Sequence, residues 1–227
     1  GEYDVQLGPG LPRIDARFAG RDLRSPAGDF EAASLLVDFE RPDFQVAVRA
    51  DQLEGGVLEV DADGLIDDTG QRQILLRRAE IDLGDQRWRL PSMAEIGWTT
   101  GGAVTVDGLR LEQVDGPGLI RAEGVVAPWD EMDLDLDVRR LPTGEVVTLI
   151  GSRLRMTGFL SLEGNVRGPA DDPTAALDFA FEEGSLRDVV VQSLAGRLTY
   201  ADGTLSLDGS GLLGDSARIQ VEGTAPA

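Results

Sequence analysis

Three aspartates recur at every second position in the middle of the chain, at Asp133, Asp135 and Asp137. This spacing resembles the start of a calcium-binding loop, where alternate carboxylates wrap around the ion. Such a loop also needs a glycine turn and polar spacers, whereas the spacers here are Leu134 and Leu136. Because the side chains of an extended strand alternate between two faces, we expect these aspartates to form a solvated strand face.

A second acidic group, Asp61–Gly64 followed by Asp67 and Asp68, has the character of a turn. It lacks the bidentate glutamate that closes a calcium loop, so weak calcium binding is only the alternative interpretation of an ordinary turn. The chain contains no cysteine and no histidine, which removes thiolate and imidazole ligands and catalytic triads. Carboxylate pairs are frequent, but no pattern marks a desolvated cleft that would separate their pKa values. We therefore expect no enzyme activity, no cofactor and no metal centre.

The charge of the chain is strongly negative, with 41 acidic residues against 21 basic ones. This balance disfavours binding to nucleic acid, because phosphates are repelled. Every basic residue is arginine, and several arginines stand in pairs: Arg77 with Arg78, Arg87 with Arg89, Arg139 with Arg140, and Arg153 with Arg155. These pairs have two interpretations. They form salt links on an outer face, or they form a rim that contacts a lipid phosphate.

Short alternating segments recur along the chain and predict the elements that position these residues. Examples are Met132–Val138, 178–182, 204–208 and 218–222, in which apolar residues alternate with polar or acidic ones. Other expected strands include 104–106, 109–111, 189–191 and 196–200. One short helix is expected near 143–150, with Thr143 at its start. We predict an all-β protein whose sheet is elongated and irregular.

The apolar side of these strands also has two interpretations. It is the closed core of a sandwich, or it lines an open groove. Aromatic residues make up only 5% of the chain, and almost no helix is expected to cover a sheet. Both facts favour the open groove. No signal peptide or long apolar segment is present, and the first residues are typical of the middle of a longer protein.

From residue 129 onward, the strand Met132–Val138 leads into Leu141-Pro142-Thr143. The cadence of 158–169 with Pro173 follows, and then the closing strands at 196–207 and 219–226. In this succession the chain resembles the TamB family of envelope proteins. The first half fits more loosely, through 88–91, 106–111 and 119–124. We expect two continuous parts, a β-sheet segment at 1–128 and a TamB-like unit at 129–227.

This resemblance implies a fold and a role. Members of the family, like related AsmA-like lipid-transfer proteins, form a β-sheet curled into a U-shaped trough (a "β-taco") with an apolar interior. They span the periplasm, are anchored in the inner membrane by a segment absent here, and work with an outer-membrane barrel of the Omp85 class (TamA-like). The implied cargo is phospholipid, held by its acyl chains.

Thirteen residues are predicted to line the apolar groove: Met132, Leu134, Leu136, Val138, Leu160, Leu162, Leu177, Phe179, Phe181, Leu205, Leu207, Ile219 and Val221. An alternative function is a chaperone-like module that holds unfolded strands of outer-membrane barrels or autotransporters by adding them to a sheet edge. A third is a structural β-solenoid stalk with a dry interior.

Overall fold

The computed structural model describes residues 2–6, 13–25, 28–40, 42–52, 57–66, 72–83, 86–127, 130–144, 156–187, 189–214 and 216–226. The chain divides into two compact units, Gly1–Gly116 and Pro117–Ala227, called unit 1 and unit 2. The sequence placed a boundary at 128/129. Each unit is described by itself below.

Unit 1 is an antiparallel sheet. Its strands are β1 (Glu2–Gln6), β2 (Arg13–Ser25), β3 (Gly28–Glu40), β4 (Asp43–Gln52), β5 (Val57–Ile66), β6 (Arg72–Leu83), β7 (Gln86–Arg89), β8 (Ala94–Trp98) and β9 (Val104–Gln113). Strands β1 to β6 pair in sequence order. The short strands β7 and β8 both pair with β6 on one side and β9 on the other, so a break at residues 90–93 separates two halves of one position in the sheet.

A small cluster of buried side chains in unit 1 lies beside this break. Trp88 is 1% exposed, and Ala79, Leu90 and Ala94 are also buried. The backbone N–H of Leu90 donates to the carbonyl of Ala79 at 2.8 Å, which holds the break against β6. Elsewhere most described apolar side chains of unit 1 are only partly buried.

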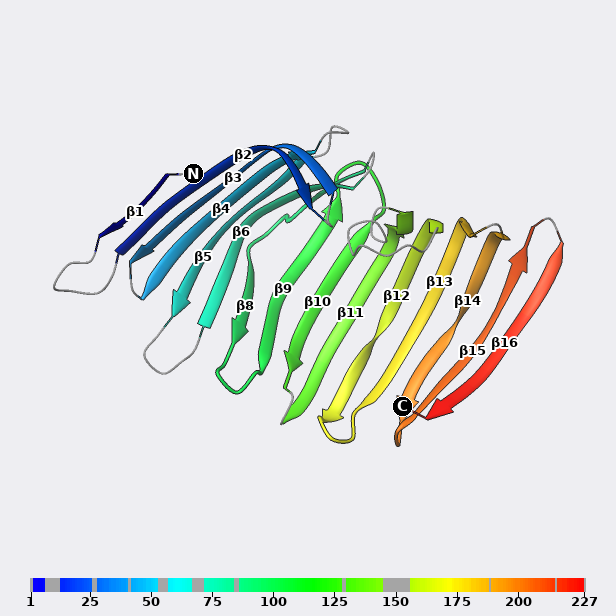
Figure 1. Cartoon of the computed structure of the whole chain (residues 1–227). Coiled ribbons are helices and arrows are strands. Elements are labelled where there is room, and N and C mark those ends of the chain that lie inside the picture. The colour runs from blue at the N-terminus through cyan, green and yellow to red at the C-terminus, as the bar shows by residue number, and fades with distance from the viewer. Residues whose placement is uncertain are drawn as a thin grey trace. The chain divides into compact units, whose positions relative to one another are not determined.

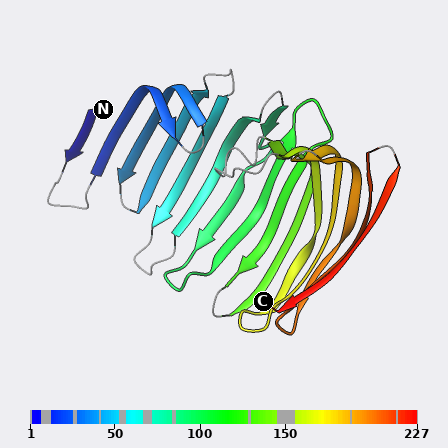
Figure 2. The same ribbon diagram turned by 45° about the vertical axis from the view of Figure 1, so that its right-hand side comes forward.

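Unit 2 is a seven-stranded antiparallel meander. Its strands are β10 (Leu119–Val126), β11 (Glu131–Pro142), β12 (Met156–Pro169), β13 (Thr174–Leu186), β14 (Val189–Ala201), β15 (Thr204–Leu213) and β16 (Ala217–Pro226). Each strand pairs with the next in the sequence (Figure 1). Figure 2 shows that these strands curve along their length. Within the described part of unit 2, no helix or second sheet covers either face.

Tight turns and bulges set the register of unit 2. Asp202 and Gly203 both have positive φ, at 50° and 65°, and connect the paired residues Ala201 and Thr204. A two-residue turn of this kind fits the twist of a hairpin and favours the sequence Asp-Gly. In β11 the pairing with β12 shifts by one residue between Val138 and Leu141, where Arg140 has a φ of 47°. This bulge leaves Leu141 on the same face as Val138.

The prediction of an all-β fold is confirmed, because strands make up nearly all of the described chain. Of the expected helix at 143–150, the structure describes Thr143 and Gly144 in helical conformation, while 145–150 lie outside the described residues. None of the described helical residues forms a segment long and apolar enough to cross a membrane.

Candidate functional site

All thirteen predicted groove residues lie in unit 2, and the strand register places them on one face of its sheet. Residues directly opposite each other on neighbouring antiparallel strands share a face. Leu136 lies opposite Gly164, which lies opposite Leu177. Leu177 lies opposite Leu198, and Leu198 opposite Leu207. One lateral row therefore crosses five strands without a polar side chain.

The other rows follow the same pattern. Val138 pairs with Leu162 and Leu162 with Phe179, while Leu160 pairs with Phe181. On the last strand, Val221 lies opposite Gly209 and Ile219 opposite Gly211. We call this surface, from Ile120 of β10 to Val221 of β16, the aliphatic face. Four neighbouring rows of this face, set by the registers of β10 to β16, contain no charged side chain.

The aliphatic face remains accessible. Of the thirteen residues, only Val138 and Phe181 are buried, at 6% and 5% exposure. The other eleven are half-buried. Side chains in a single sheet shield one another laterally, but burial from above requires a second layer. Of the two interpretations of the apolar side, an open surface therefore fits the burial of unit 2 better than a closed sandwich core.

Glycines on this face are covered by a neighbouring aromatic ring. A Cβ atom added to Gly196 would lie 3.0 Å from Cε1 of Phe179, and one added to Gly209 would lie 3.6 Å from its Cζ. The ring of Phe179 therefore lies sideways over the backbone of β14 and β15. The surface at this point is lined by an aromatic ring instead of by side chains of those two strands.

Several residues of the aliphatic face were absent from the sequence-based set. Ile120, Val166, Leu194 and Leu198 lie in its rows, as does Tyr200, opposite Leu205. The alternation of Leu198 and Tyr200 within the expected strand at 196–200 was the signal that could have identified that part of the face.

The opposite surface of unit 2, which we call the polar face, carries ordered charge. One lateral row is charged on all seven strands: Arg121, Asp137, Glu163, Asp178, Arg197, Asp208 and Glu222. Two Arg197 nitrogens donate to the two Asp178 carboxylate oxygens at 2.6 and 2.7 Å. These hydrogen bonds, with the charge of the guanidinium, lower the pKa of Asp178 below its ordinary value.

Asp133, Asp135 and Asp137 lie on this polar face. Arg167 of β12 forms ion pairs with both Asp133 and Asp135, the latter at 2.7 Å. Arg139 donates two hydrogen bonds to the two carboxylate oxygens of Asp137, at 2.9 and 2.7 Å, and these bonds raise the pKa of Arg139.

Within the described residues, no group of three or more acidic side chains is placed to hold a metal ion. Asp61, Asp63 and Gly64 of the second acidic group lie within β5 and not in a turn. Asp67 and Asp68 lie outside the described residues.

Most described members of the arginine pairs bind carboxylates. Arg77 pairs with Asp63, Arg78 with Glu59 and Glu80, and Arg87 with Asp82 and Glu80. Arg140 lies 3.6 and 3.5 Å from Glu182 and Glu183, and its guanidinium stacks 4.2 Å from the centre of the Phe159 ring. These contacts are the salt links of the first interpretation. Arg153 and Arg155 lie outside the described residues.

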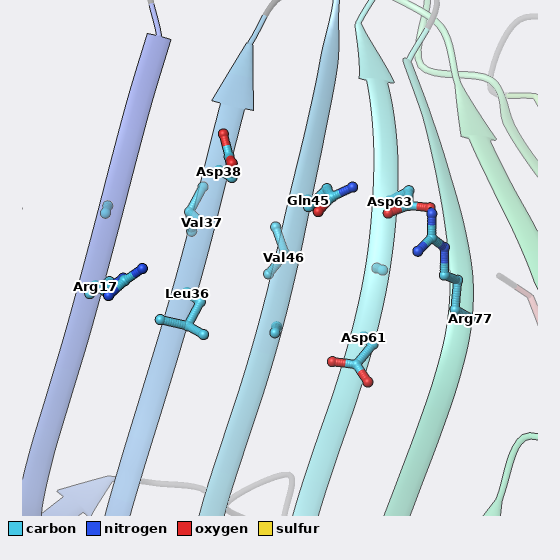
Figure 3. A pocket seen from close by; sticks show the side chains of 12 residues that line it. Arg17, Leu36, Val37, Asp38, Gln45, Val46, Asp61, Asp63 and Arg77 are labelled. Atoms are coloured by element: carbon cyan, nitrogen blue, oxygen red, sulfur yellow. The ribbon is translucent and has the colours of Figure 1, made fainter. Parts of the chain in front are cut away.

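Unit 1 carries a shallow hollow over β2 to β6 (Figure 3). Arg17, Leu36, Asp38, Gln45 and Asp61 share one face of this sheet, as the registers of β2 to β5 show. Figure 3 shows Arg17 at one side of Leu36 and Asp61 beyond β4 on the other. Half of the residues that line the hollow are charged or polar and half are apolar, so the hollow differs in character from the aliphatic face of unit 2.

Comparison with known proteins found no relative: no family model, no curated protein and no solved structure matches the chain.

Proposed function

We propose that unit 2 binds the acyl chains of phospholipids on its aliphatic face. The observation that carries the proposal is the set of four charge-free rows, three of which cross all seven strands, with eleven of the thirteen predicted residues half-buried. Acyl chains need an apolar surface without directed hydrogen bonds, and this face offers one. The resemblance to the TamB family supports the wider role: a segment of a periplasmic bridge that carries phospholipid between the inner and outer membranes, with an outer-membrane barrel of the Omp85 class as partner of the parent protein.

The dimensions of the face suit such a ligand. Six spacings of about 4.8 Å between neighbouring strands give a row about 29 Å wide, which exceeds the length of a common acyl chain. A methylene group fully removed from water gains about 0.8 kcal/mol, and contact on one side gains roughly half of that. A chain of about ten methylenes on this face would then bind with an affinity of order millimolar. Weak binding spread over many equivalent positions allows the chain to slide, which suits transport better than storage.

The test is lipid binding by matched variants. Leu136→Asp places a carboxylate in the middle of the aliphatic face, whereas Asn165→Asp adds the same charge to the polar face, one strand away. A second matched pair is Phe179→Arg on the aliphatic face and Thr199→Arg on the polar face of the next strand. We expect Leu136→Asp and Phe179→Arg to weaken binding of a fluorescent lysophosphatidylcholine at least about five-fold, with circular dichroism showing an intact sheet and both controls near wild type.

Mass spectrometry of lipid that co-purifies with the protein provides the second readout. We expect phospholipid in the wild-type sample and its loss from Leu136→Asp. Equal binding by all four variants would contradict the proposal, as would an absence of lipid together with no measurable binding of the probe.

A further inference from the structure

A second hollow lies on the polar face of unit 2, over β14, β15 and β16. Four polar side chains line it, from Ser193, Ser210, Arg218 and Gln220, together with Ala195 and Leu212 of the same face. Gly211 and Ile219, which alternate with these residues along β15 and β16, complete the lining. None of the described lining residues is acidic. The chain as a whole has 41 acidic residues, and the hollow of unit 1 is lined by three aspartates.

The register explains how these side chains come together. Ser210 lies directly opposite Gln220, and Leu212 lies opposite both Ser193 and Arg218. An extra residue in β14 between Val191 and Ser193 sets this pairing. Because all four polar residues share one face, a long Arg218 side chain can extend over Leu212 toward the serine hydroxyls.

Arg218 differs from the arginines in the centre of the polar face. Arg121, Arg139, Arg167 and Arg197 each form an ion pair with a carboxylate. Among the described residues, none forms an ion pair with Arg218. The nearest acidic members of the charged row on these strands are Asp208 and Glu222, two residues beyond Ser210 and Gln220 along their strands. Gln220 donates to Glu222 at 2.9 Å, so its amide stands between that carboxylate and the hollow.

We propose that this hollow binds a phosphate group, either free phosphate or the phosphodiester of a lipid headgroup. A guanidinium offers parallel N–H donors that match phosphate oxygens, and serine hydroxyls and an amide add neutral donors. None of the described lining residues has a carboxylate that could bind a cation. All four polar residues are exposed, so the affinity is of order millimolar and falls as ionic strength rises.

The site does not depend on the proposed function, because it lies on the face of the sheet opposite the aliphatic face. Its test therefore uses water-soluble probes without acyl chains. The probes are inorganic phosphate and glycerophosphocholine, which carries the phosphodiester of a lipid headgroup. The readout is the Nε–Hε signal of Arg218 in a nitrogen–proton correlation spectrum of the full chain during titration.

We expect a saturable shift of the Arg218 signal with at least one probe. Arg218→Gln should weaken binding roughly ten-fold or more, as monitored by the backbone amide of Ser210, and Arg218→Lys should restore part of it. The matched control is Arg187→Gln, which removes an exposed arginine that does not line the hollow. It should bind as the wild type does.

The two probes identify the source of the phosphate. Tighter binding of glycerophosphocholine indicates a lipid headgroup, and tighter binding of inorganic phosphate indicates the free ion. A shift that rises linearly without saturation, or an equal affinity of wild type and Arg218→Gln for both probes, would overturn the proposal. Failure of this site leaves acyl-chain binding on the other face untouched, and the reverse also holds.

Discussion

At the scale of single residues, the arginines in the centre of the polar face of unit 2 pair with neighbouring carboxylates. The clearest case joins Asp178 of β13 to Arg197 of β14, which lie directly opposite each other. Both side chains are exposed, at 56% and 61%. Surface pairs of this kind add little to stability because water and salt screen them. Their main effect is to fix side-chain geometry and to relieve repulsion between the many carboxylates of this face.

The Asp178–Arg197 pair predicts a pH dependence of stability. The folded pKa of Asp178 lies below its ordinary value of 3.8. Its contribution is therefore fully present above the unfolded pKa and is lost as the pH falls through the folded pKa. We expect Asp178→Asn to lower the urea midpoint at neutral pH and to differ progressively less from wild type as the pH falls below the ordinary pKa of an aspartate.

The control for this measurement is Glu163→Gln, which removes one carboxylate from the same row. Two differences in urea midpoint are followed as the pH falls: wild type minus Asp178→Asn, and wild type minus Glu163→Gln. If the pair acts through its specific hydrogen bonds, the first difference changes more steeply than the second. Identical pH profiles of the two variants would show that only the general charge of the row matters.

At the scale of elements, each strand of unit 2 is two-faced, and its glycines allow close approach between neighbouring strands. A Cβ atom at Gly196 would collide with the carbonyl oxygen of Asp208 and lie 2.7 Å from Cα of Gly209. At Gly223, on the same face, an added Cβ meets nothing within 4 Å. These two positions form a matched pair for testing the packing of β14 against β15.

We expect Gly196→Ala to destabilise the protein by about 1–3 kcal/mol, because backbone atoms must move. Gly223→Ala should be neutral or slightly stabilising, since alanine restricts the unfolded chain. Urea denaturation followed by circular dichroism measures both. Similar midpoints for the two variants would show that β14 and β15 are not packed as closely as the structure places them.

The sequence predicted the faces of individual strands but not how the strands meet. Period-2 alternation was enough to place Met132 to Val138 on the aliphatic face, because alternation is a property of one strand. The segments 189–191 and 196–200 were predicted as separate strands, whereas the structure joins them in β14. Between them lie Gln192, Ser193, Leu194 and Ala195, where an extra residue interrupts the period-2 alternation, so the prediction divided the strand.

The pairing of residues across strands could not be predicted from the sequence, and the reason is physical. A register depends on each turn and bulge along the sheet, and the bulges near Arg140 and Ser193 shift it by one residue each. The encounter of Ser193, Ser210 and Arg218 in one hollow depends on the register of three strands. No local sequence pattern predicts that these three residues meet.

At the scale of the whole molecule, a chain with a net charge of −20 keeps an accessible aliphatic face. The acidic polar face keeps such a protein soluble and discourages association between copies. The two faces should also respond differently to salt, because screening weakens charge interactions and leaves apolar contacts intact.

We therefore expect the affinity for lysophosphatidylcholine to remain unchanged, within about two-fold, between about 0.05 and 0.5 M sodium chloride. Phosphate binding at Arg218 should weaken several-fold over the same range. Fluorescence titration measures the first and the nuclear magnetic resonance titration the second. A strong loss of lysolipid affinity with salt would mean that the headgroup, and not the acyl chain, provides the binding energy.

Site-specific photocrosslinking shows directly which face of unit 2 contacts lipid. A photoreactive phenylalanine derivative replaces Leu136 or Leu177 on the aliphatic face, or Asn165 or Thr199 on the polar face, in protein mixed with phospholipid vesicles. We expect lipid adducts from the two aliphatic positions and almost none from the two polar ones. Adducts of equal yield on both faces, or none from either aliphatic position, would contradict this expectation.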